Sequence, residues 1–223
     1  MSDDEFIELC EHGDTKKITE AINDGANANA RNDRGTTALI LASSEGHLEA
    51  VKILLENGAD INAKNINGYT ALSEATFWGE IPVAEFLLKH DADVNAETKE
   101  GCTALTWAIS RCNLTAAELL LRYGADLNAK DHYGRTPLRY AEKAGAVEIL
   151  IEHGADVNAK DINGTTALMW AALIGNAETV KALIKSGADI EAEDNKGWTA
   201  LRFAEVKGRE EIIGLLRKNS VAI

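Results

Sequence analysis

The chain has 223 residues, of which 45% are hydrophobic and only 5% are aromatic, and its formal net charge is -13. This acidity argues against nucleic acid as the main partner, because duplex binding draws most of its affinity from neutralised phosphates. The first residues are acidic and no apolar run approaches membrane-spanning length, so we expect a soluble protein without a signal peptide.

The segment 2–31 predicts two short helices with a polar outer side. One apolar cluster around Phe6 ends near Gly13, and a second around Ile18 ends before Gly25. The turn that would precede the first of these helices is missing. We therefore expect an N-terminal cap, because terminal units of a repeat array need a polar outer face.

The next segment, 32–64, predicts two helices ended by glycines. Thr37 is placed as an N-cap, apolar residues follow at helical spacing, and Gly46 can adopt the left-handed conformation that ends a helix. A second helix is expected over 47–57, with Gly58 at its end. Two helices this short cannot bury both of their faces alone, so each pair needs neighbours.

The landmarks of this segment return along the chain at a fixed interval. The glycine before the first helix recurs at intervals of 33, 33, 33, 30 and 33 residues, as Gly35, Gly68, Gly101, Gly134, Gly164 and Gly197. A period of this size is typical of a solenoid.

Three repeats depart from the pattern. In 65–97 the glycine after the second helix is replaced by Asp91, and Pro82 falls in the first turn of that helix, where proline is tolerated. In 98–130 Cys112 replaces the glycine between the helices; no base or cation is placed to activate its thiol, which favours a structural role. The repeat 131–160 is three residues short between Gly145 and Gly154, so we expect its second helix to begin near Ala146 and to be almost a turn shorter.

The pattern G-x-T-A-L-x-x-A-x-x-x-G, a second helix and then G-A-D-x-N-A resembles the ankyrin repeat over nearly the whole chain. The resemblance implies an all-α solenoid of helix-turn-helix units with short finger turns. It implies one domain, 1–223, with caps at 1–31 and 194–223 and five full repeats at 32–64, 65–97, 98–130, 131–160 (short) and 161–193. The histidine usual in the family after the T-A-L leucine is absent from every copy, which puts its hydrogen-bond bracing in doubt.

No catalytic pattern is found in the sequence. It has no phosphate-cradling glycine loop, metal-binding helix motif or nucleophile elbow, and we expect no enzyme activity, metal or cofactor. His90 and His153 precede the position of a loop glycine and are interpreted as capping residues. The C-terminal 221–223 suggests either a terminal peptide ligand or, as we prefer, fraying apolar residues. Three cysteines without metal spacing, Cys10, Cys102 and Cys112, favour free thiols in a reducing compartment, and so a cytoplasmic protein.

In the family that the chain resembles, partners usually dock on the concave side, made by the finger tips and the ends of the first helices. At those positions we count seven basic residues, Arg34, Lys99, Arg111, Arg135, Lys143, Lys196 and Lys207, against three acidic ones, Asp33, Glu45 and Glu100. Large apolar residues also fall there, and internal packing does not require them, so we expect some of them to be exposed. The candidate partner-binding residues are Tyr69, Phe77, Trp78, Ser110, Arg111, Tyr133, Arg135, Arg139, Lys143, Leu173, Ile174 and Trp198, with Ile66 and Ile162 as further apolar finger residues.

These features favour a monomeric protein-binding scaffold or adaptor. We expect its partner to be a protein with an acidic and apolar surface, and neither nucleic acid nor a membrane. An ankyrin binder engineered or evolved against a chosen target remains an alternative, as does a repeat-based enzyme or regulatory subunit. The short repeat, Asp91 and Cys112 argue against wholesale consensus design.

Overall fold

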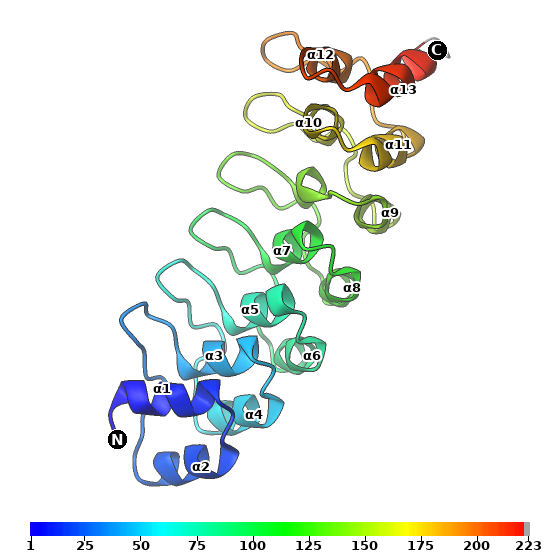
Figure 1. Ribbon diagram of the computed structural model, residues 1–223. Coiled ribbons are helices and arrows are strands. Elements are labelled where there is room, and N and C mark those ends of the chain that lie inside the picture. The colour runs from blue at the N-terminus through cyan, green and yellow to red at the C-terminus, as the bar shows by residue number, and fades with distance from the viewer. Residues whose placement is uncertain (221–223) are drawn as a thin grey trace. The chain divides into compact units, whose positions relative to one another are not determined.

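The computed structural model describes residues 1–220 and is built of short helices joined by loops (Figure 1). The residues 221–223 of the suggested terminal ligand lie outside this range. The chain divides into two compact units: unit 1 is Met1–Ala108 with Thr115–Ala125, and unit 2 is Ile109–Leu114 with Asp126–Ile223. Within 1–220 no helix is both long and apolar enough to cross a membrane.

The expected all-helical class is confirmed, since the described residues contain helices and one isolated bridge between Arg31 and Thr37 but no strand. In the first part of the chain the helices are α1 (Asp3–Glu11), α2 (Thr15–Asn23), α3 (Ala38–Ser44), α4 (Leu48–Glu56), α5 (Ala71–Trp78), α6 (Ile81–Lys89), α7 (Ala104–Ser110) and α8 (Leu114–Arg122). They are followed by the 3-10 turn η1 (Pro137–Tyr140) and by α9 (Ala144–Glu152), α10 (Ala167–Ile174), α11 (Ala177–Lys185), α12 (Ala200–Val206) and α13 (Glu210–Ser220).

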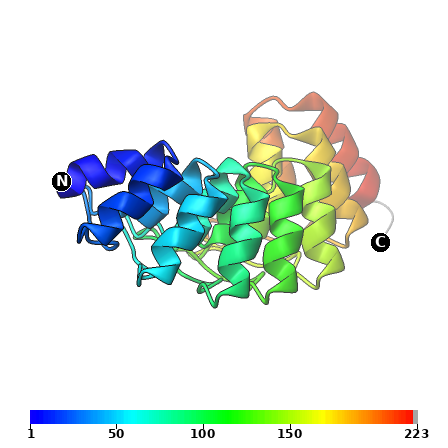
Figure 2. The ribbon, with the colours of Figure 1, turned by 90° about the horizontal axis from the view of Figure 1, so that it is seen from below.

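Helices pack in two layers within each unit. In unit 1, α1, α3 and α5 form one layer and α2, α4 and α6 form the other (Figures 1 and 2). In unit 2, α10 packs on α12, and α11 packs on α9 and α13. Leucine and alanine side chains fill the space between the layers and are almost fully buried, among them Leu39, Leu54, Leu72, Leu87, Leu150, Leu168 and Leu183. Alanine lets neighbouring helices approach closely, so the pairs stack without large gaps.

The threonine of the T-A-L motif caps the first helices. The Oγ1 atoms of Thr37, Thr70, Thr166 and Thr199 each accept a hydrogen bond from the backbone N–H three residues later. In α5 the hydroxyl of Ser73, at the position of the absent histidine, accepts the Thr70 N–H at 2.9 Å. A short hydroxyl side chain thus provides local bracing in that repeat through a capping box.

The fingers are held by a repeated turn and by bonds to the next finger. The Oδ1 atoms of Asn65 and Asp161 each accept two backbone N–H groups, two and four residues later. Between fingers, the Ile66 N–H donates to the Arg34 carbonyl in unit 1, and the Ile162 N–H donates to the Tyr133 carbonyl in unit 2, both at 3.0 Å. The backbone of each finger is therefore fixed while its outward side chains remain free to differ.

Two residues other than glycine take up left-handed backbone conformations in the described chain: Asp91, with a φ of 64°, and Cys112, with a φ of 55°. Both residues replace a glycine that recurs in other repeats, so the backbone keeps the conformation of the glycine turn although the side chain has changed. Pro82 lies in the first turn of α6, as expected. His90 and His153 are C-cap residues, and their Nδ1 atoms bond to the carbonyl oxygens of Phe86 and Ile149.

The prediction for the short repeat was wrong. Its second helix, α9, has nine residues, as many as α4. Helix α9 begins eight positions after the N-cap Thr136, whereas α4 begins eleven positions after Thr37. All three missing residues therefore come from the first helix and its turn. The first helix shrinks to η1, and Gly145 lies inside α9 instead of between the helices. The second helix is retained, with Val147 and Leu150 fully buried, and it packs against α11.

We predict that replacing Cys112 with glycine stabilises the protein. A side chain at a φ of 55° costs roughly 1 kcal/mol relative to glycine. The melting temperature of Cys112→Gly should therefore rise by about 2 to 4 °C. The control is Cys112→Ala, which removes the thiol but keeps the strained Cβ. A gain in both variants, or in neither, would contradict a backbone origin for the effect.

Candidate functional site

The predicted site residues of unit 1 lie on and beside α5. Tyr69 directly precedes the N-cap of α5, while Phe77 and Trp78 form its last turn before Gly79. Trp78 is 58% exposed, and Tyr69 and Phe77 are half-buried. The neighbouring finger therefore does not bury Trp78, and the expectation of exposed large apolar residues is confirmed at this position.

Rings in unit 1 form a continuous chain from the finger to the end of α5. The ring centroids of Tyr69 and Trp107 are 5.9 Å apart, as are those of Trp107 and Phe77, and Phe77 meets Trp78 edge-on at 5.2 Å. Edge-to-face pairs at such distances are favourable beyond the area that they bury. The chain of rings ends at the exposed indole of Trp78.

A carboxylate lies beside these rings. The Nε1–H of Trp78 donates to Oε2 of Glu74, one helical turn earlier on α5, at 3.1 Å. Burial raises the pKa of Glu74, and the hydrogen bond from Trp78 only partly offsets this. Burial also raises the pKa of the Tyr69 hydroxyl, with smaller contributions from Glu100 and Glu74.

The predicted site residues of the first finger in unit 2 surround a buried carboxylate. Nε of Arg135 lies 2.7 Å from Oδ2 of Asp131, which also accepts the Tyr140 hydroxyl at 2.5 Å. The guanidinium carbon of Arg135 lies 4.4 Å from the centre of the Tyr133 ring and 5.2 Å from that of Tyr140. Burial alone would raise the pKa of Asp131, but the bonds from Tyr140, Arg135 and the Tyr133 backbone hold it below its usual value.

Arg139 stacks on Trp170 of α10, the first helix of the following repeat. Its guanidinium carbon is 3.8 Å from the centre of the Trp170 ring, within the range of a cation–π interaction. Its buried Nε finds no hydrogen-bond partner within 1–220. Burial lowers the pKa of Arg139 to about 10, with Asp161 acting in the opposite direction, so the side chain stays cationic at neutral pH.

The other predicted residues of unit 2 are more scattered. Ser110 and Arg111 lie at the end of α7, Leu173 and Ile174 are half-buried in the last turn of α10, and Trp198 packs edge-on against Phe203 at 5.2 Å. Lys143 is exposed, but it is the N-cap of α9 and not the end of a first helix as expected, because η1 ends at Tyr140.

Four residues of these sites were not predicted from the sequence: Trp107, Asp131, Tyr140 and Trp170. Three of them share a signal, since Trp107, Tyr140 and Trp170 stand four residues after the N-cap threonine of their repeats, as does Glu74. Aligning the repeats at this position would have revealed a column of mostly aromatic side chains.

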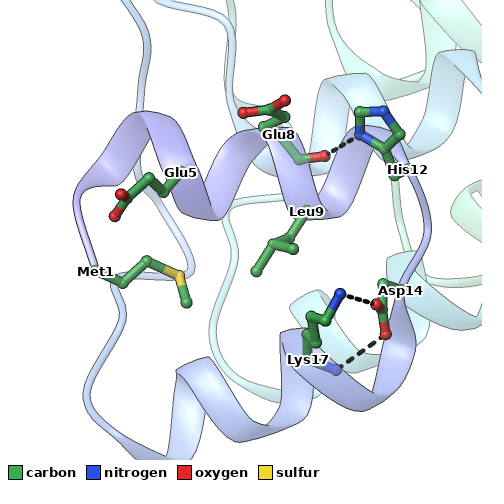
Figure 3. Close-up of a pocket in the computed structure, with 7 residues that line it drawn as sticks. All are labelled: Met1, Glu5, Glu8, Leu9, His12, Asp14 and Lys17. Atoms are coloured by element: carbon green, nitrogen blue, oxygen red, sulfur yellow. Dashed lines mark hydrogen bonds and ion pairs between the residues drawn. The ribbon is translucent and has the colours of Figure 1, made fainter.

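A separate hollow lies between α1 and α2 (Figure 3). It is lined by Met1, Glu5, Glu8, Leu9, His12, Asp14 and Lys17. Lys17 pairs with Asp14 at 2.9 Å, and Nδ1 of His12 bonds to the Glu8 carbonyl. No predicted site residue lines this hollow, and these polar groups are already engaged with each other.

The titratable groups do not assemble into a metal centre among the described residues, where no group of three or more His, Cys, Asp or Glu side chains converges. Burial raises the pKa of the Cys10 thiol to about 12, so this cysteine is protonated at neutral pH and is a poor nucleophile.

Comparison with protein families gives a match to the model for ankyrin repeats, in three copies, over residues 6–98, 92–161 and 142–223. The chain belongs to the ankyrin repeat family. A search of curated proteins found no match. Ankyrin repeats are in general modules for protein–protein interaction, and catalysis is not typical of them.

Membership in the ankyrin family accounts for the fixed fingers and helix pairs, but it does not assign a role to any side chain. The repeat boundaries at 32–64, 65–97, 98–130, 131–160 and 161–193 stay a prediction. The same holds for the partner-binding role of the residues described above.

We predict that Asp131→Asn destabilises this ankyrin chain by about 1 to 3 kcal/mol at neutral pH, because it removes the charge that the bonds from Arg135 and Tyr140 stabilise. Since folding lowers the pKa of Asp131, its contribution is complete above the unfolded pKa, about 4, and is lost as the pH falls through the folded value. Urea unfolding of parent and variant should therefore differ at pH 7 and converge in acid.

The matched control for this prediction is Asp156→Asn. Asp156 also accepts the backbone N–H two residues later, but it is exposed and pairs with no cation among the described residues. Equal destabilisation by the two substitutions at pH 7 would show that the buried network at Asp131 adds nothing.

Proposed function

We propose that this ankyrin-repeat chain is a scaffold or adaptor that binds a partner protein through its finger tips and the ends of its first helices. The distribution of exposed apolar side chains supports the proposal. Five of the seven large hydrophobic residues exposed in 1–220 lie at these positions: Ile66 (51% exposed), Trp78 (58%), Tyr133 (55%), Ile162 (61%) and Val206 (53%). The other two are Met1 and Tyr123.

Such side chains carry a cost for a monomer in water, because exposed apolar patches promote association. Packing of the repeats does not require them either, since the buried positions are filled by alanine and leucine. Large aromatic residues and arginine dominate the energetics of protein interfaces. Exposed aromatic residues at the finger tips and first-helix ends therefore fit a surface that binds a partner protein.

Charge at the same positions favours a partner with an apolar centre and an acidic rim. Arg135 and Arg139 are held by ring contacts and remain cationic beside Tyr133 and Trp170. Arg111 and Lys143 are exposed. This local excess of positive charge on a chain of net charge -13 favours acidic protein surfaces over nucleic acid. We further propose a cytoplasmic monomer without a cofactor or enzymatic activity.

We predict that Trp78→Ala and Arg111→Glu each weaken partner binding by about 1 to 4 kcal/mol and leave the melting temperature nearly unchanged. The reason is that the exposed parts of these side chains contribute to an interface and little to the core. The full chain is immobilised, proteins captured from a cell extract are quantified by mass spectrometry, and a purified captured protein is then titrated against each variant.

The control is Tyr123→Ala, which removes another exposed aromatic residue, located after the second helix α8. It should leave capture and titration unchanged. If Trp78→Ala and Arg111→Glu lower the melting temperature but not the affinity, or if Tyr123→Ala alone weakens capture, the binding site lies on another face.

A further inference from the structure

Glu74 stands at a repeat position that is otherwise occupied by large apolar residues. The same place, four residues after the N-cap threonine, holds Leu41, Trp107, Tyr140, Trp170 and Phe203 in the other repeats. Of these six residues only Glu74 is ionisable near neutral or acidic pH. Glu74 therefore places a carboxylate at a position where four of the other repeats have an aromatic ring.

The surroundings of Glu74 stabilise a negative charge poorly. The residue is half-buried and makes no ion pair with any described residue. The carboxylate of Glu74 accepts one hydrogen bond within 1–220, from the Nε1–H of Trp78 to Oε2. Its Oε1 atom accepts none there. Burial accordingly raises the pKa of Glu74. A carboxylate in such a place needs a cation to offset its desolvation.

Unit 2 contains a similar grouping in which the cation is present. There the Asp131 carboxylate binds the Arg135 guanidinium at 2.7 Å, and the same guanidinium lies against the rings of Tyr133 and Tyr140. Unit 1 has a carboxylate and aromatic rings, but Tyr69 stands at the repeat position of Arg135. Glu74 itself stands at the repeat position of Tyr140, and Asn65 stands at that of Asp131, so the two carboxylates come from different repeat positions. Because Tyr69 replaces the arginine, the finger of this repeat supplies no arginine to Glu74.

We propose that Glu74 and Trp78 form a binding site for an arginine side chain of the partner protein. The guanidinium donates to Oε1 of Glu74 and lies against the exposed indole of Trp78, with Tyr69 at the side of the finger. Arginine suits this site better than lysine, because its planar group can hydrogen-bond to a carboxylate and stack on a ring at the same time. The partner then carries a basic residue within a surface that is otherwise acidic and apolar.

This inference rests on the proposed function, since it specifies what the α5 part of the binding surface recognises. A purely structural role is the competing explanation, in which Glu74 only orients the Trp78 indole. The two differ in one respect: the structural role requires the hydrogen bond to Trp78, whereas the binding role requires the negative charge and a free oxygen.

The experiment uses the full chain and a small probe, Nα-acetyl-arginine amide. Binding is followed by NMR through the indole N–H resonance of Trp78, which is assigned by its loss in Trp78→Phe. Nα-acetyl-citrulline amide, of nearly the same shape but without charge, and Nα-acetyl-lysine amide are titrated at matched ionic strength. Glu74→Gln keeps the shape of the side chain, and Glu56→Gln, at an exposed residue near the end of α4, is the matched control.

We expect saturable binding of the arginine probe, and binding of the citrulline probe weaker by about fivefold or more, from loss of the cation–π and charge-assisted contacts. Glu74→Gln should reduce binding of the arginine probe by a similar factor, and Glu56→Gln should not change it. Thermal melts of both variants establish that they are folded.

Equal binding of arginine and citrulline, or unchanged binding to Glu74→Gln, would overturn the proposal, and tighter binding of lysine would overturn its choice of arginine. If no probe binds but Trp78→Ala still weakens partner capture, the scaffold function stands and the arginine site does not. If both results are negative, the α5 end is not a binding surface at all.

Discussion

Each helix pair in this protein depends on its neighbours to bury its apolar faces. The helices are 7 to 11 residues long, and helices of such length are marginal in water when isolated. Alanines such as Ala42 and Ala75 are fully buried where first helices meet, while leucines such as Leu54 and Leu87 fill the layer of second helices. The free energy of unfolding therefore depends largely on the interfaces between adjacent repeats. A substitution that changes the distance between two helix pairs affects the repeats on both sides of it.

This constraint divides the residues of a repeat into two groups. Residues that cap a helix, form a turn or pack between repeats can be of only a few types, as at the helix cap Thr70 and the turn residue Asn65. Those at the finger tips and at the outer end of the first helix lie outside the stack, and the side chains there can change at little cost to folding. Two of these variable regions differ in this way. The aromatic rings of α5 include the exposed indole of Trp78, whereas the Asp131 network contains an ion pair to a buried carboxylate.

The short repeat shows which half of a repeat is more tolerant. Its first helix is reduced to the four residues of η1, yet Leu138 and Ala141 remain buried and α9 keeps its full length. A 3-10 turn can still place one apolar side chain in the layer, whereas a second helix that lost a turn would leave the outer layer without Val147 or Leu150. The loss is therefore accommodated near the surface that carries the candidate binding residues.

The sequence by itself determined the helical class, the period and the glycine-ended helices, because these follow from local chemistry that recurs at fixed spacing. It also indicated where large apolar residues would be exposed, as at Trp78. It could not assign the three-residue loss to η1, since that depends on which helix the neighbouring repeats need more. Nor could it show that Glu74 lies beside Trp78 without an ion pair to any residue of 1–220, while Asp131 is paired with Arg135. Only the tertiary structure decided this, because burial and the partners of a charge are set by residues distant in the sequence or on another turn of the helix.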